Sequence, residues 1–232
     1  MIPQNYKHAR CIDFHTFNPW AIVWLAVSPQ DEIFVYNEFA PSPEKYTTWD
    51  IAKVIAARSG DYKFIIDLID PLANTREVST GRTPCEDLNI HALTLKIEGL
   101  GAGAYWQAAD TRNERGIDEF RKRLANSLRV GVPFNNKNPK LAPGEPRYLP
   151  TIWILDRCTL TIESLKNWRR EEWADRNSKL TKDAKDKPQQ RYSHFCHAIE
   201  YLLKRDEVCK AIWREFTGRP NRPKHYMDAH TR

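Results

Sequence analysis

Three segments of the chain carry carboxylates or imidazoles next to apolar runs. CIDFH places Asp13 in a strand-like stretch, IIDLID places Asp67 and Asp70 near the end of another, and RYSHFCHAIEYLL places His194 and His197 beside a helical apolar stripe. An ionised carboxylate among apolar neighbours is costly unless a cation or a metal ion compensates it. These residue types suit divalent metal ions, and two such ions can support hydrolysis of a phosphodiester.

Each of these residues also has an ordinary structural interpretation. Asp13 could be a strand-end residue that faces solvent, and Asp70 could cap the turn before Pro71. Either histidine could bond to a backbone carbonyl in the core. Asp67 and Asp70 are three residues apart and should face opposite sides of a sheet, so only one of them is expected to join Asp13. Asp67 has the more apolar neighbours and therefore the higher cost of burial, whereas Asp70 stands at the strand end before Pro71, where loops often carry function.

The segments around these residues predict a mixed α/β fold. β-branched and aromatic residues between turn signals predict strands at 11–15, 20–27, 32–40, 62–70 and 151–156. Helical spacing predicts a helix that begins at Ser42 as N-cap and ends at Gly60, a short helix from Cys85, and helices over 115–129, 161–176 and 191–203. This order matches the ribonuclease H-like architecture, with a mixed central sheet of about five strands and helices on both faces.

The composition limits the class of protein. The chain has 232 residues and a formal net charge of +6, which suits a polyanionic partner. Its five cysteines are odd in number and never spaced as CxxC, which argues against a disulfide framework and a structural zinc site. No run of about 18 apolar residues occurs, so no membrane span is expected. The run GLGAG lacks the Lys-Ser/Thr of a P-loop, so we expect no ATPase site in this sequence.

Four segments, residues 11–39, 65–75, 150–168 and 194–203, together resemble the C-terminal nuclease domain of tailed-bacteriophage large terminases. The resemblance implies an endonuclease that cuts concatemeric viral DNA with two divalent ions, Mg²⁺ or Mn²⁺, in the cytoplasm of the infected bacterium. It implies metal ligands at Asp13 and Asp70, with Asp67 in reserve. The implied partners are double-stranded DNA, a packaging ATPase motor, a small terminase subunit and a portal. We expect this nuclease domain over residues 1–212 and a basic, flexible tail over 213–232.

The chain departs from the family pattern in its last helix. The family keeps an acidic residue there, whereas this sequence has Ser193-His194. A neutral imidazole binds Mn²⁺ and, less readily, Mg²⁺, so we expect His194 to replace the third acid and to shift the preference toward manganese. His197 is expected to lie next to the apolar stripe, and Glu200 is the next candidate if His194 is not a ligand.

Contacts to DNA are expected to go mainly to phosphates. Arg76 and Arg82, in the loop after the fourth strand, are the first candidates. A second set, Arg121, Lys122 and Arg123, lies on the helix over 115–129, where an ordinary solvated face is the stronger interpretation. Two other functions fit the same residues. One is a resolvase- or transposase-like nuclease on the same fold, and the other is a DNA-binding or assembly module whose catalytic site has decayed.

Overall fold

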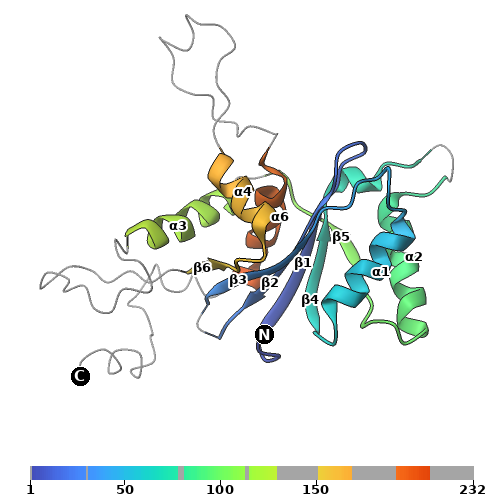
Figure 1. The fold of residues 1–232 in the computed structure, drawn as a ribbon, viewed down its shortest axis with the longest axis horizontal. Helices are drawn as coiled ribbons and strands as arrows, with labels where there is room; N and C mark the ends of the chain where they lie inside the picture. Colours follow the sequence, from blue (N-terminus) through green and yellow to red (C-terminus); the bar gives the residue numbers. More distant parts are fainter. Residues whose placement is uncertain are drawn as a thin grey trace, which may run out of the picture.

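A six-stranded mixed sheet forms the centre of the protein (Figure 1). The computed structural model describes residues 2–29, 31–77, 81–112, 115–129, 151–168 and 192–209. The strand order is β5-β4-β1-β2-β3-β6. The three strands that come first in the sequence form an antiparallel meander, β1 Lys7–Asp13, β2 Ala21–Val27 and β3 Ile33–Phe39. Strand β4, Phe64–Ile69, then pairs in parallel with β1.

Two short strands complete the sheet at its edges. Strand β6, Ile152–Ile154, lies within the strand expected over 151–156 and pairs in parallel with β3. Strand β5, Trp106–Ala108, pairs in parallel with β4 and was not expected. Strand β5 has only three residues, too few to show the alternation of apolar and polar side chains that marks a strand, and it lies beside the turn-rich run GAGA. The expected α/β sheet is therefore confirmed, with six strands in place of about five.

Helices cover both faces of the sheet (Figure 1). One face carries α3 Arg115–Arg129, α4 Thr159–Asn167, α6 His194–Leu203 and α7 Asp206–Cys209, and their apolar residues form a single core with the sheet. The other face carries α1 Thr48–Ser59 and α2 Pro84–Ile97 over a second core. All five cysteines are free and buried.

The alternation of side chains along β1 decides which residues reach which core. Ala9 and Cys11 point into the core under α6, whereas Ile12 points into the core under α1 and α2. Asp13 follows at the same parity as Ala9 and Cys11, so it faces α6. Arg10 has the parity of Ile12 and faces the opposite way.

The first helix begins later than the sequence indicates. Thr47, not Ser42, is the N-cap of α1: its hydroxyl accepts a hydrogen bond from the Asp50 N–H, and the Asp50 carboxylate accepts one from the Thr47 N–H, each at 3.2 Å. This capping box satisfies two backbone donors at once, whereas Ser42 only begins a turn that includes Lys45. Helix α2 has the same type of cap and extends to 14 residues, longer than the short helix expected.

Several expected segments lie outside the described residues. They are the Pro- and Asn-rich loop over 135–150, the part of the helix over 161–176 that follows residue 168, the charged linker over 177–190, and the tail over 213–232. Within the residues that the structure describes, no helix combines the length and the apolar character needed to cross a bilayer.

Candidate metal centre

Asp13 and Asp70 meet at the ends of two neighbouring strands. Ile12 of β1 pairs with Ile69 of β4 in parallel register, so the residues that follow them are adjacent. The Asp70 N–H donates to the Ile12 carbonyl at 2.8 Å, which continues the ladder one step beyond β4. The side chain of Asp13 is only 3% exposed. Two carboxylates that are far apart in sequence are thus held together by the sheet.

Two histidines converge on one oxygen of Asp13. His15 Nε2 lies 3.0 Å and His194 Nδ1 lies 3.1 Å from Asp13 Oδ2, and the two nitrogens are 2.5 Å apart. His15 follows β1 by two residues, and His194 is the first residue of α6. The three residues form a cluster of the kind that could hold a metal ion. We refer to Asp13, His15 and His194 as the triad.

Helix α6 places further polar side chains next to the ends of β1 and β4. The Tyr201 hydroxyl donates to Asp70 Oδ2 at 2.7 Å, and the Leu72 N–H donates to Asp70 Oδ1 at 2.7 Å, so the Asp70 carboxylate is fixed from both sides. His194, His197 and Tyr201 are three and four residues apart and share one face of the helix. His197 is half-buried on that face, so it lies on the side of α6 that carries the site as well as beside the apolar stripe.

The loop that carries His15 is anchored to the protein. The Trp20 indole N–H donates to the His15 carbonyl oxygen at 2.8 Å, and the ring centroids of Phe14 and Trp20 are 4.8 Å apart. Trp20 is itself buried in the core under α1 and α2. The backbone position of His15 is therefore set by packing against Trp20.

The electrostatics of the triad favour an ionised Asp13. Burial would raise the Asp13 pKa, but the hydrogen bonds to His15 and His194 outweigh that effect and the pKa is lowered. The same bond to Asp13 raises the His15 pKa, although burial opposes it. Burial lowers the pKa of His197, with Asp13 and Asp70 opposing. The site therefore holds the negative charge of Asp13 between two imidazoles, and a metal ion bound there would require both rings to be neutral.

Asp67 does not join the triad. It faces the opposite side of the sheet, as its three-residue offset from Asp70 predicts, and its Oδ1 lies 2.6 Å from Arg10 Nε. Its second oxygen accepts a hydrogen bond from the Tyr105 N–H at 3.1 Å. A buried cation therefore already neutralises the reserve candidate.

Glu200, the other alternative ligand, is also separate from the triad. It is buried on α6, and its Oε1 has no hydrogen-bond partner among the described residues. Burial raises its pKa to about 8, with Lys204 and Arg121 opposing in part. Glu200 therefore lies apart from Asp13, His15 and His194, which form the cluster that could hold an ion.

The expected DNA-binding residues differ in exposure. Arg76 and Arg82 are exposed in the segment after β4, and Arg82 Nη1 is 3.4 Å from Asp87 Oδ1. Arg121 and Lys122 are exposed on α3, in keeping with a solvated face.

Arg123 does not belong to that solvated face, so the expectation for it is wrong. Its side chain is 2% exposed, and its Nε lies 3.1 Å from Glu119 Oε1. Its Nη1 donates to the carbonyl oxygens of Asp31 and Thr151. The charges of Arg121, Lys122 and Arg123 alone suggested that all three side chains face solvent. Arg123 instead points inward, and its hydrogen bonds connect α3 to the loops at the edge of the sheet.

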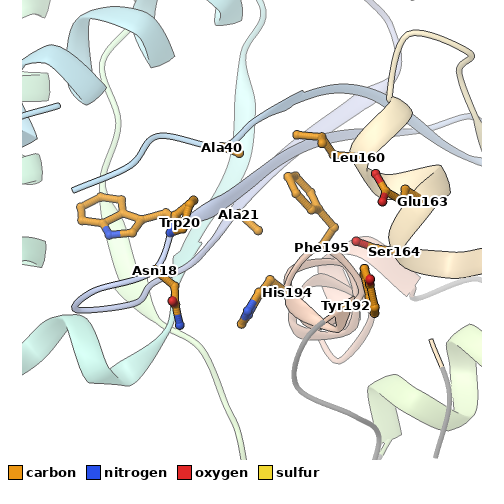
Figure 2. Close-up of a pocket in the computed structure, with 11 residues that line it drawn as sticks. Asn18, Trp20, Ala21, Ala40, Leu160, Glu163, Ser164, Tyr192, His194 and Phe195 are labelled. Carbon is orange, nitrogen blue, oxygen red and sulfur yellow. The ribbon is translucent and has the colours of Figure 1, made fainter. Parts of the chain in front are cut away.

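A pocket of about 470 Å³ opens beside the triad. Figure 2 shows it between the β1–β2 connection, with Asn18 and Trp20, and the helices α4 and α6. His194 and Phe195 both line it, so one wall of the pocket is shared with the triad. Its other polar side chains include Asn18, Glu163 and Ser164, and the lining residues that the structure describes include no Lys or Arg. The triad therefore borders an open pocket through His194.

His15 is the member of the triad that sequence reasoning missed. The segment CIDFH does contain the signal, because residues two apart in an extended chain point to the same side. Asp13 and His15 stand in that relation. The sequence could not show that His194, 181 positions from Asp13, would complete the group.

The sheet order and the helices on both faces define a ribonuclease H-like α/β domain, and the chain's similarity to solved structures agrees. The P22 large terminase nuclease domain matches with a TM-score of 0.56 and 12% identity, over 91% of this chain and 84% of that one. The large terminase of a thermophilic bacteriophage matches with a TM-score of 0.55 and 15% identity, over 88% of this chain and 41% of that one. The chain thus has the fold of a large-terminase nuclease domain and spans about two fifths of the thermophilic phage protein. No protein-family model and no curated protein sequence matches it.

Proposed function

We propose that this chain is a metal-dependent DNA endonuclease of the large-terminase type, which cuts concatemeric viral DNA during genome packaging. The observation that carries the proposal is the meeting of Asp13, Asp70 and His194 at one edge of the sheet. These residues come from two strands and the last long helix described, the three elements from which the sequence resemblance implied ligands. The proposed partners are double-stranded DNA, a packaging ATPase motor, a small terminase subunit and a portal, in the cytoplasm of the infected bacterium.

The donor set fits two divalent ions, Mn²⁺ or Mg²⁺. Asp13 is buried, ionised and not paired with Lys or Arg in the described structure, and Asp70 is held in a fixed orientation beside it. When bound, two such ions stabilise the attacking and the leaving oxygen of a phosphodiester. The residues of the chain orient these ligands: Tyr201 and the Leu72 N–H fix Asp70, and the imidazole of His194 reaches Asp13 from α6.

The DNA backbone is proposed to pass the open side of the triad. Arg76 and Arg82 follow Asp70 along the chain and are exposed, so they are the proposed phosphate contacts. The pocket beside His194 is lined by Trp20, Leu160 and Phe195 among its described residues, so we propose it for the sugar or base of a neighbouring nucleotide.

Plasmid cleavage tests the proposal. The purified chain should nick and linearise plasmid DNA in Mn²⁺ with little sequence preference and stop when a chelator is added. Asp70→Asn should remove this activity, whereas Asp61→Asn, which alters an exposed aspartate, should not. Cleavage in excess chelator, or none with any divalent ion, would contradict the proposal. Cleavage restricted to branched DNA would support the resolvase-like alternative, and DNA binding without cleavage would support a decayed module.

A further inference from the structure

We propose that the triad is one face of a binding site for a single first-row transition-metal ion, such as Mn²⁺, Co²⁺ or Zn²⁺, with His15 as a ligand in its own right. This inference deepens the proposed function, on which it rests for the role of the ion, because it names the class of metal at one of the two positions. Binding of the ion is measurable whether or not the chain cuts DNA.

The spacing of the three ligand atoms supports a shared ion. Neighbouring ligands around an octahedral ion with metal–ligand distances of about 2.1 Å lie about 3 Å apart. His15 Nε2 and His194 Nδ1 are 3.0 and 3.1 Å from Asp13 Oδ2, which agrees with that spacing. The two nitrogens, at 2.5 Å, are closer still. All three atoms therefore lie close enough together to share one ion.

The convergence of these atoms also calls for a cation. In a metal-binding state both ring nitrogens are unprotonated, so together with the carboxylate oxygen they are three electron-pair donors, which repel one another unless a cation lies between them. A proton on one ring can satisfy one or two of the contacts at a time. A metal ion accepts the electron pairs of Asp13, His15 and His194 simultaneously, so it satisfies the whole triad.

The two imidazoles decide the class of the ion. Mg²⁺ prefers oxygen ligands and gives up its water reluctantly, whereas imidazole suits Zn²⁺, Co²⁺ and related transition metals. The neighbouring position beside Asp70 is different, because its fixed donors are the carboxylate oxygens, with Tyr201 and the Leu72 N–H bonded to them. The two ion positions of the proposed nuclease should therefore prefer different metals.

Exposure shows that the triad is open on one side. The Asp13 side chain is 3% exposed, but those of His15 and His194 are 26% and 24% exposed. Protein fills the inner side of an ion held there, and the outer side remains accessible to water or substrate. A structural ion is normally enclosed by four protein ligands, so three ligands with an open side fit a catalytic site.

Titration of the metal-free full chain with Co²⁺ tests the inference, because bound Co²⁺ has a visible absorption spectrum that reports nitrogen ligands. We expect one Co²⁺ to bind at least about a hundredfold more tightly than Mg²⁺, measured by calorimetry. His15→Ala should weaken Co²⁺ binding by at least about tenfold, because loss of even an outer-shell partner costs roughly 10–100-fold. His15→Asp should restore binding and shift the preference toward Mg²⁺.

His91→Ala is the matched control, since His91 lies on α2 at the other face of the sheet and contacts Thr48. It should bind Co²⁺ as the parent chain does. Equal affinity for Co²⁺ and Mg²⁺, or parental Co²⁺ binding by a folded His15→Ala chain, would overturn the inference. Tight Co²⁺ binding that depends on His15, with no DNA cleavage in any metal, would support the site and contradict the proposed function.

Discussion

Strands β1 and β4 carry two pairs of neighbouring polar residues, and the buried charge is compensated differently in each pair. Arg10 of β1 pairs in register with Asp67 of β4, and three residues further along Asp13 lies beside Asp70. The first pair combines opposite charges, whereas the second combines two carboxylates. Both Asp67 and Asp13 are buried. A buried carboxylate that is paired with a cation of the protein can have a purely structural role. A buried carboxylate without such a partner is stabilised by a cation bound from solution.

The Arg10 side of this comparison is fully satisfied within the protein. Arg10 donates to Asp67 at 2.6 Å, to the Ser59 hydroxyl at 2.8 Å and to the Gly103 carbonyl at 3.2 Å. Its guanidinium carbon also lies 3.8 Å from the ring centroid of Phe64. The triad, in contrast, offers Asp13 only imidazoles, which can be either neutral or charged.

Glu200 is a third buried carboxyl group, and its charge is neutralised by a bound proton. Burial raises the pKa of Glu200 to about 8, so the side chain is neutral at pH 7. The three buried carboxylates Asp67, Glu200 and Asp13 are thus neutralised by an arginine, by a proton and, in our proposal, by a metal ion. This comparison leads to three tests.

The largest effect is expected from Asp13→Asn. Loss of the shared metal-binding carboxylate should reduce the rate of DNA cleavage by about a thousandfold or more, because metal stabilisation of the reaction amounts to several kcal/mol. The free energy of unfolding of the metal-free chain should change by only about 1 kcal/mol, since an amide oxygen can still accept a hydrogen bond. Single-turnover cleavage and urea unfolding of the same preparation measure both. A stable variant that cuts like the parent would remove Asp13 from the site.

The next effect concerns the framework pair. Asp67→Asn should lower the free energy of unfolding by about 3–5 kcal/mol, because it leaves the buried Arg10 cation without a counter-charge. The double variant Arg10→Met/Asp67→Leu removes both charges and should recover most of that loss. Urea unfolding monitored by circular dichroism gives both values. If the double variant is as unstable as Asp67→Asn, the charge imbalance is not the cause.

The smallest effect is expected from Glu200→Gln. With a pKa of about 8 in the folded state and 4.5 in the unfolded state, Glu200 costs nothing below pH 4.5. Between pH 4.5 and 8 only the unfolded chain loses the proton, so the folded state becomes progressively less stable. Glu200→Gln removes this penalty and should raise the free energy of unfolding by up to about 3 kcal/mol at pH 7, and by almost nothing at pH 4. Unfolding at several pH values measures it, and parallel pH profiles for both chains would contradict the raised pKa.

The sequence predicted most of the sheet because its strands have strong local signals. The apolar runs around Val23, Val35 and Leu68 predict β2, β3 and β4 without knowledge of the tertiary structure. The two departures in helix boundaries and strand number arise where the local signal is weak. Thr47 is the N-cap in place of Ser42 because it forms the two hydrogen bonds of a capping box with Asp50. Strand β5 depends on its pairing with β4.

The sequence identified Asp13, Asp70 and His194 as separate candidates, but it did not show which side chains would come together in the triad. The apolar surroundings of Asp13 and the strand-end position of Asp70 are local properties, and both residues meet as the parallel pairing of β1 and β4 requires. The membership of His15 and the inward turn of Arg123 depend on what packs opposite them. The exclusion of Asp67 follows from its parity, but its pairing with Arg10 requires the register between two strands.

The sequence distance within the triad has a consequence for biosynthesis. His194 comes from a helix that is made 181 residues after Asp13, and it can approach Asp13 only when α6 has packed against β1 and β2. Contacts between segments so far apart form late in folding, because the intervening chain must first be ordered. A nascent chain on the ribosome therefore has its carboxylates in place before its second imidazole arrives. The chain should acquire its full capacity to bind the ion only after nearly the whole domain has emerged.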